Sequence, residues 1–258
     1  MTLTMKRMPI GFTLGVFLLC TGQVTTIRAG EQPKQFVLIS IDVPGYPSLA
    51  PQGINDSGDI AGQIIDAQGV IRHGFLMRPG EAAVSIDHPG AGAGGVTAAT
   101  GINAQGDIVG WYRLPGEASD PLAAHGYLLS RKGRFTAIDY PGHLNTLPQR
   151  ITSTGTILGC YHDLDNMDSM HGFTKSADGS FTGFPSSPSM SNGATPDASR
   201  IVGKYETHSF VIDRGDFLSF DVPDSTLTSA YDVNPQGEIV GHFQDSSGRF
   251  HGFFRDED

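Results

Sequence analysis

The sequence predicts an all-β fold, a five-bladed β-propeller whose blades have four strands each. Three observations support this prediction. A phrase of the type GINAQGDIVG occurs in five variants, and each copy leads to a short apolar strand that begins with histidine. Equivalent copies lie 37 to 52 residues apart, near the length of about 40–50 residues that is typical of one blade. No window shows a sustained 3.6-residue apolar period, so almost no helix is expected after residue 29.

The first strand of each repeat ends in a tight turn. The five copies read PQGINDSGDIAG from Pro51, ATGINAQGDIVG from Ala99, PQRITSTGTILG from Pro148, GATPDASRIVG from Gly193 and AYDVNPQGEIVG from Ala230. Asparagine at the start of such a turn can bond the backbone two residues on, and glycine at its end accepts a positive φ. The phrase therefore predicts a hairpin between the first two strands.

The second strand carries a glycine two places after its leading isoleucine. These glycines are Gly62, Gly110, Gly159, Gly203 and Gly241. A glycine inside a strand indicates a bulge or the close approach of another backbone, and we expect the neighbouring blade to supply it. The position after the glycine varies most, and it holds Gln63, Trp111, Cys160, Lys204 and His242.

The third and fourth strands form a second hairpin. The third begins at His73, His125, His171, His208 and His251, and the fourth ends at Asp87, Asp139, Phe184 and Asp221. The histidine and aspartate lie 13 or 14 residues apart across a central glycine. Residues at equal distance from a turn face each other, so we predict His–Asp pairs of about 0.2–1 kcal/mol each. The third repeat should lack the pair because Phe184 takes the aspartate position.

The fifth repeat lacks a fourth strand of its own. A matching segment, QFVLISIDVPG, stands near the other end, from Gln35 to Gly45. We expect the strand from Phe36 to Asp42 to complete the last blade, with Asp42 paired to His251. Such an interlock closes the ring and leaves no open sheet edge. Residues 30–258 would then form a single domain.

Residues 1–29 have the layout of a secretory signal peptide. Lys6 and Arg7 precede an apolar run from Ile10 to Cys20, and Ala29 offers a cleavage position before Gly30. The run is too short for a comfortable membrane span. We therefore expect a secreted or periplasmic protein without a membrane span in its mature chain. Lipidation of Cys20 is disfavoured because Leu19 stands where a small residue is needed.

Composition disfavours nucleic acid as a partner and an intramolecular disulfide. The formal net charge is -10, and removal of three cations with residues 1–29 takes it to about -13. Such a surface disfavours nucleic acid, whose binding depends on clustered Lys and Arg. One cysteine remains, Cys160, which cannot form an intramolecular disulfide and is expected to be buried. No motif calls for a cofactor, and a monomer is expected.

The repeated residues do not point to catalysis or to a strong metal site. Histidines on the third strands lie too far from one another to share one ion. Asp163, Asp165 and Asp168 form a weak calcium candidate, although they lack the spacing and glycine of a calcium loop. Near the innermost strands stand only Asp56, Asp197 and Asp232, at non-equivalent positions. A glycoside-acting enzyme, which needs two carboxylates about 5–10 Å apart, is the alternative.

Binding is the favoured function. Trp111, Gln63, Lys204 and His242 stand where the copies differ, and an aromatic ring such as Trp111 can stack on a sugar. We expect a non-catalytic binding or scaffolding module, with carbohydrate or a cell-envelope protein as partner. A purely structural interaction protein is a further alternative.

The histidine-led strands resemble the HAF family of probable extracellular repeats. The matching residues are His73-Gly74-Phe75, His171-Gly172-Phe173 and His251-Gly252-Phe253, with His125-Gly126-Tyr127 and His208-Ser209-Phe210 as variants. The resemblance covers about residues 36 to 256. It implies an exported bacterial repeat protein without an established activity, and it supplies no catalytic residues. The fourth repeat departs most, with Ser199 and Ser209 in place of glycines.

Overall fold

A computed structural model describes residues 40–43, 45–117, 120, 123–143, 145–163, 166–184 and 188–256, without the side chains of 166–168. The chain divides into two compact units, Met1–Ser40 and Ile41–Asp258. Apart from Ser40, only the second unit is described below. The predicted signal peptide, residues 1–29, lies outside the described residues, and so does most of the predicted closing strand.

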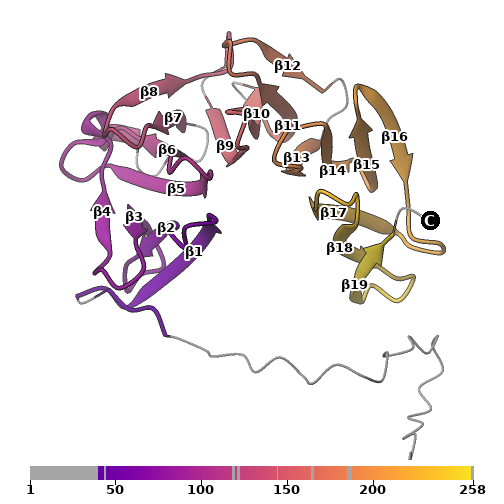
Figure 1. Ribbon diagram of the computed structural model, residues 1–258, viewed down its shortest axis with the longest axis horizontal. Coiled ribbons are helices and arrows are strands. Elements are labelled where there is room, and N and C mark those ends of the chain that lie inside the picture. The colour runs from indigo at the N-terminus through magenta and orange to yellow at the C-terminus, as the bar shows by residue number, and fades with distance from the viewer. Residues whose placement is uncertain are drawn as a thin grey trace, which may run out of the picture. The chain divides into compact units, whose positions relative to one another are not determined.

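The second unit is built from antiparallel sheets, and its described residues contain nineteen strands (Figure 1). The first sheet contains β1 (Ser48–Ile54), β2 (Ile60–Ile65), β3 (Ile71–Met77) and β4 (Val84–Ile86). The second contains β5 (Val96–Ile102), β6 (Ile108–Arg113), β7 (His125–Leu129) and β8 (Phe135–Ile138). The third contains β9 (Asn145–Ile151), β10 (Ile157–Asp163), β11 (Asn166–Lys175) and β12 (Phe181–Gly183). The fourth contains β13 (Ser189–Ala194), β14 (Arg200–Tyr205), β15 (His208–Asp213) and β16 (Asp216–Phe220).

The fifth sheet has three described strands, β17 (Leu227–Val233), β18 (Ile239–Gln244) and β19 (Phe250–Arg255). Residues 36–39 of the predicted fourth strand lie outside the described residues, and residues 40–42 are described without strand structure. Closure by this segment therefore stays a prediction. The only helical structure among the described residues is two 3-10 turns, Pro89–Ala91 and Pro115–Glu117.

The turn phrases form the hairpins that the sequence predicts. In the first repeat, Asn55 Oδ1 accepts hydrogen bonds from the backbone N–H groups of Ser57 and Asp59 at 3.0 and 2.9 Å. Gly58 closes this turn with φ +80°. The side-chain oxygen thus accepts hydrogen bonds from backbone N–H groups of the turn, which explains why asparagine begins it.

The glycines of the second strands accompany a bulge and the close approach of another backbone, as predicted, but that backbone belongs to the same sheet and not to the neighbouring blade. Every first strand carries a one-residue bulge, and the bulged residues are Gln52, Thr100, Gln149, Asn192 and Tyr231. The bulge pushes a carbonyl of the first strand towards the second, where a Cβ on Gly110 would overlap the oxygen of Ala98. The ring of Tyr127 fills the remaining space. The close approach therefore arises within one sheet and not between neighbouring blades.

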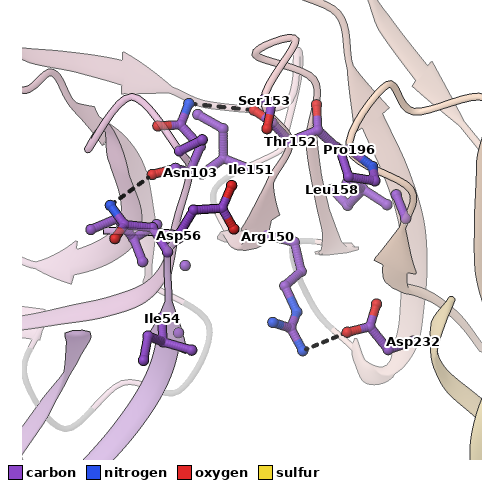
Figure 2. Close-up of a pocket in the computed structure, with 16 residues that line it drawn as sticks. Ile54, Asp56, Asn103, Arg150, Ile151, Thr152, Ser153, Leu158, Pro196 and Asp232 are labelled. Atoms are coloured by element: carbon purple, nitrogen blue, oxygen red, sulfur yellow. Dashed lines mark hydrogen bonds and ion pairs between the residues drawn. The ribbon is translucent and has the colours of Figure 1, made fainter. Parts of the chain in front are cut away.

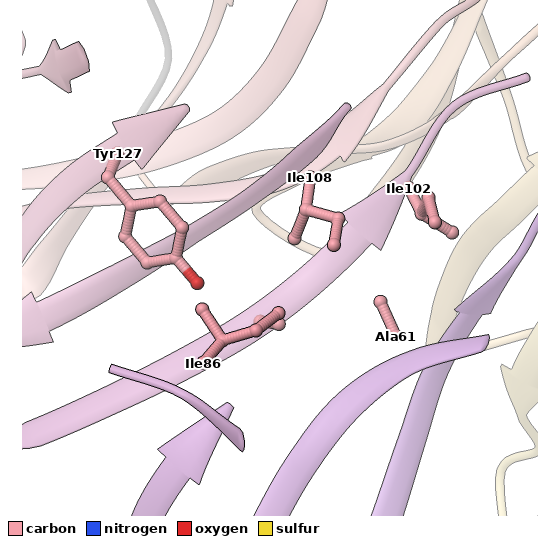
Figure 3. Close-up of a cluster of buried hydrophobic side chains, with 6 residues drawn as sticks. Ala61, Ile86, Ile102, Ile108 and Tyr127 are labelled. Carbon is pink, nitrogen blue, oxygen red and sulfur yellow. The ribbon is translucent and has the colours of Figure 1, made fainter. Parts of the chain in front are cut away.

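Apolar clusters join each sheet to the next along the chain. Figure 3 shows the first of them, in which Ala61 and Ile86 of the first sheet meet Ile102, Ile108 and Tyr127 of the second. Equivalent clusters join the second sheet to the third, the third to the fourth and the fourth to the fifth. The core is thus a series of contacts between consecutive sheets. No helix in the described part of the chain has the length and apolar character that a membrane crossing needs.

Candidate functional site

The variable residues of the second strands lie on separate sheets. Gln63, Trp111, Cys160, Lys204 and His242 stand opposite Gly74, Gly126, Gly172, Ser209 and Gly252 on the third strands. A Cβ on Gly74 would touch Ala99 of the second sheet, so this column points towards the following sheet. The structure therefore does not gather the four predicted ligand-binding residues at one place.

Trp111 and Cys160 show the surroundings of these variable second-strand residues. Trp111 is partly buried, and the Arg113 guanidinium carbon lies 5.0 Å from the centre of its ring. Cys160 is fully buried, and burial raises the pKa of its thiol to about 12. A thiol that stays protonated is a poor nucleophile, so Cys160 acts as a packing residue.

Histidine and aspartate meet across the second hairpin in the repeats that carry both. His73 Nδ1 lies 2.5 Å from Asp87 Oδ1, and His208 Nδ1 lies 2.7 Å from Asp221 Oδ2. In the second repeat, the distance from His125 Nδ1 to Asp139 Oδ1 is 3.7 Å. These contacts are spread over separate hairpins, so they stabilise the hairpins and form no common site.

The third and fifth repeats use other partners. His171 Nε2 lies 3.4 Å from Asp163 of its own sheet, since Phe184 occupies the usual aspartate position. His251 Nε2 bonds Asp245 at 2.9 Å, in the adjoining turn of the fifth sheet. The described residues show no bond between His251 and Asp42, whose predicted pairing depends on the closing strand.

The calcium candidate is only partly described. Asp163 ends β10 and lies 3.5 Å from His143 Nδ1. Asp165 lies outside the described residues, and the side chain of Asp168 is also outside them. Within the part of the chain that is described, no group of three or more metal-ligating residues could hold an ion.

The most distinctive cavity lies among the first turns of the repeats. It has a volume of about 220 Å³, and we call it the turn pocket (Figure 2). Its lining comes from all five sheets and comprises Gly53–Asp56, Gly101–Ala104, Arg150–Ser153, Leu158, Ala194, Pro196 and Asp232. The equivalent turns of the repeats thus meet at one cavity, and residues that differ between the repeats can lie side by side there.

Two charged residues of the turn pocket replace a repeated glycine. Gly53, Gly101 and Gly193 occupy the second-to-last position of their first strands, and the third and fifth repeats have Arg150 and Asp232 there. The side chains point towards each other in Figure 2, and Arg150 Nη2 lies 3.9 Å from Asp232 Oδ2. Each side chain is a little under half exposed. The ion pair therefore leaves hydrogen-bonding capacity for a ligand.

The walls of the turn pocket are fixed by hydrogen bonds between successive turns. Asn55 Nδ2 donates to the carbonyl of Asn103 at 3.2 Å, and Asn103 Nδ2 donates to the carbonyl of Thr152 at 3.3 Å. Asn103 is buried. The repeated asparagine thus forms its own turn and also holds the next one in place.

The carboxylates near the innermost strands do not all share one cavity. Asp56 and Asp232 line the turn pocket, whereas Asp197 lines a separate cavity of about 590 Å³. A hydrogen bond from the Thr195 hydroxyl, followed by bonds from Ser199, lowers the pKa of Asp197 to about 2. Asp197 therefore serves as a turn residue. The turn pocket combines two carboxylates with one guanidinium.

Arg150 was not among the residues that the sequence singled out. Its signal was present, because an arginine interrupts a position that is glycine in three other repeats. The pairing with Asp232 could not be anticipated, since it joins the third and fifth sheets and depends on the arrangement of all the turns.

Known proteins give only a distant likeness. No family model matches the chain, and no curated protein matches it, so the resemblance to the HAF family stays a prediction. Similar solved structures include a putative TolB from Agrobacterium tumefaciens, with 14% identity, 83% of this chain and 68% of that chain covered, and a TM-score of 0.46. A variant of AofleA from Arthrobotrys oligospora is 15% identical. The match covers 83% of this chain and 71% of that chain, with a TM-score of 0.48. A lectin variant from Aleuria aurantia in complex with α-methyl-L-fucoside has 13% identity, 78% and 71% coverage and a TM-score of 0.44.

Proposed function

We propose that the protein is an exported, non-catalytic binding or scaffolding module that takes a carbohydrate or a cell-envelope partner at the turn pocket. Its fold would be a five-bladed β-propeller, completed by the strand from Phe36 to Asp42. The observation that carries the proposal is the replacement of a repeated glycine by Arg150 and Asp232, whose side chains meet in a cavity that all five sheets line.

The chemistry of the turn pocket suits a small polyhydroxyl group. Arg150 supplies hydrogen-bond donors, while Asp56 and Asp232 supply acceptors. Ile54, Ile102 and other apolar side chains line the same cavity and can contact the carbon face of a sugar ring. Its volume of about 220 Å³ lies below the range of about 300–1,000 Å³ for drug-sized ligands, so one sugar unit fits better than a long chain.

A glycan array tests the proposal on the exported protein. We expect a signal for a restricted set of glycans, and its loss in Arg150→Gly and Asp232→Gly. Both variants restore the residue that other repeats carry, so they should fold. Lys132→Ala, which changes an exposed residue of a distant turn, is the matched control. An array without signal would contradict carbohydrate as the ligand and favour the interaction-only alternative.

A glycoside-acting enzyme is the second candidate, because Asp56 and Asp232 line the same cavity. Glycosidases place two carboxyl groups on either side of the bond that they cleave. Here Asp232 contacts a guanidinium, an arrangement that favours binding over proton transfer. Hydrolysis of a glycan identified on the array, abolished by Asp56→Asn and by Asp232→Asn, would overturn the non-catalytic proposal.

Export has a test of its own. Mass spectrometry of the protein recovered outside the cytoplasm should show a new amino terminus near Gly30. A terminus at a lipidated Cys20 would contradict the proposed cleavage, and a protein that keeps residues 1–29 in the cytoplasm would contradict export.

A further inference from the structure

The cavity that Asp197 lines borders the turn pocket, and we call it the side cavity. It has a volume of about 590 Å³ and lies among turns of the fourth and fifth sheets, which contribute Arg200, Arg214 and Gln236 to its lining. Pro196 lines the side cavity and also the turn pocket (Figure 2). The two cavities therefore border the same turn, and a ligand that extends past Pro196 reaches both.

The side cavity belongs mainly to the repeat that departs most from the others. The residue before the leading isoleucine of the second strand is Arg200 in the fourth repeat, whereas the other repeats have Asp59, Asp107, Thr156 and Glu238. In the first and fifth repeats this acidic residue bonds the side-chain amide of the asparagine that begins the turn. The fourth repeat begins its turn with Thr195, so that amide is missing and the charge has changed sign.

Arg214 occupies a backbone position that favours another type of residue. It stands with Gly215 at the tip of the hairpin between β15 and β16, and the two residues have φ +50° and +100°. A two-residue turn with both φ positive is typical of Asn-Gly or Asp-Gly. Other residues are strained there, and strain of this kind clusters at ligand-binding sites. The backbone N–H of Arg214 donates to the carbonyl of Ser199 at 2.8 Å, which holds the tip against the turn that carries Pro196.

The side cavity offers hydrogen-bond donors that the fold does not use. Asp213 pairs with Arg200 Nε at 3.4 Å, whereas Arg214 Nε lies 4.0 Å from the other oxygen of Asp213. The Arg214 side chain is 83% exposed and keeps most of its donors. Among the described residues, the side-chain amide of Gln236 has no hydrogen-bond partner, although its backbone N–H bonds Asn234. A guanidinium of the fourth sheet and an amide of the fifth thus line the same cavity.

The charges in and beside the side cavity balance. Arg200 and Arg214 are offset by Asp197 and Asp213. Asp197 Oδ1 already accepts hydrogen bonds from two hydroxyl groups of its own turn. A charged ligand would therefore gain little from this cavity, whereas the hydroxyl groups of a neutral sugar can accept from the guanidinium and from the amide.

We propose that the protein binds a neutral oligosaccharide of at least two units, with the terminal unit in the turn pocket and the next unit in the side cavity. The linkage between them passes Pro196, and Arg214 and Gln236 select for length. The turn pocket, at about 220 Å³, has room for one unit, whereas the side cavity lies within the range of about 300–1,000 Å³ for ligand sites. This inference rests on the proposed function and adds to it a second site with residues of its own.

Titration calorimetry with sugars of increasing length tests the second site. The probes are three neutral series: glucose, cellobiose and cellotriose; N-acetylglucosamine, chitobiose and chitotriose; mannose, mannobiose and mannotriose. In a series that binds, we expect the disaccharide to bind about tenfold more tightly than the monosaccharide. Arg214→Gly and Gln236→Ala should each remove most of this gain and leave the affinity for the monosaccharide unchanged. Arg214→Gly should fold, because glycine adopts φ +50° without strain.

Two further variants separate this inference from the proposed function. Lys132→Ala removes a cation from the equivalent turn of the second sheet, where Lys132 precedes Gly133 as Arg214 precedes Gly215, and it should keep the gain with length. Arg150→Gly should weaken the monosaccharide and the disaccharide alike. Equal affinity for one and two units, or a gain that persists in both side-cavity variants, would overturn the second site and leave the turn pocket standing. If no series binds, the neutral oligosaccharide is wrong, and a signal on the glycan array would still support the proposed function.

Discussion

The contact between the second and third sheets and the face of the fifth sheet that carries Val240 are built from the same repeat. In the first of these regions Val109 is fully buried, the Thr100 hydroxyl donates to the carbonyl of Pro148 at 2.7 Å, and Asn103 reaches Thr152. In the second, Val240 and the bulged residue Tyr231 are about half exposed. Burial of the same position therefore depends on the neighbour and not on the sheet itself.

This difference separates two kinds of constraint. The glycine of the second strand is required inside every sheet, because the bulge and the aromatic ring of the third strand leave no space for a Cβ. Apolar residues on the side of a sheet that points towards the following sheet, such as Val109 and Val240, stabilise the protein only where that sheet covers them. Substitutions of the two kinds should therefore behave differently in the second and fifth sheets.

The largest effect is expected for Gly110→Ala. The new methyl group would overlap the Ala98 carbonyl and the buried Tyr127 ring, and we expect a loss of about 3 kcal/mol in the free energy of unfolding. Gly241→Ala should cost less, because Phe253 is only partly buried and can turn away. Denaturant unfolding measures both, with Gly116→Ala as control, since nothing lies within 4 Å of that position. Equal and small losses would show that the sheets tolerate the overlap.

The next effect compares two valines at equivalent positions. Val202→Ala removes fully buried methyl groups and should cost about 2 kcal/mol. Val240→Ala should cost about 1 kcal/mol if the proposed five-bladed ring closes and covers it, although the described face leaves it half exposed. Chemical denaturation of the two variants gives the ratio of their losses in the free energy of unfolding. A cost for Val240→Ala below about 0.3 kcal/mol would mean that the face stays open.

A smaller effect is expected at the asparagine turns. Asn103→Ala removes the bond to the carbonyl of Thr152 in the next turn together with the bond that the backbone N–H of Asp107 donates to Asn103 Oδ1, and should cost about 1–2 kcal/mol. Asn234→Ala in the fifth sheet should cost less, because its amide bonds Glu238 of the same turn. Thermal unfolding of both variants tests this order. A larger loss for Asn234→Ala would contradict the importance of the bond between turns.

The smallest effect is expected in the stability of the protein at acidic pH. The pKa of Asp197 is lowered to about 2 by the hydroxyl of Thr195, so its ionised form favours the folded state. This contribution is complete above the unfolded pKa near 4 and is lost as the pH falls towards 2. Asp197→Asn should therefore flatten the decline in melting temperature between pH 4 and 2. An unchanged pH profile would show that the turn does not depend on this charge.

Much of the fold could be predicted from the sequence because its signals are local and repeated. The hairpin turns, the strand order and the burial of Cys160 follow from residues that lie close together along the chain. Which backbone approaches the strand glycines could not be predicted, since the position of a bulge depends on the register between two strands. The turn pocket was missed for a related reason. Arg150 and Asp232 are 82 residues apart, and only the stacking of successive sheets brings them together.

The bonds between asparagine turns also bear on how the protein would respond to force. Asn55 holds the turn of the second sheet, and Asn103 holds that of the third, so load applied to the ends passes through one turn at a time. A stretched molecule should then give way sheet by sheet, as a series of similar steps in a pulling trace. Among the described residues the fifth sheet shares an apolar cluster with the fourth sheet and none with a following sheet, so it should yield first.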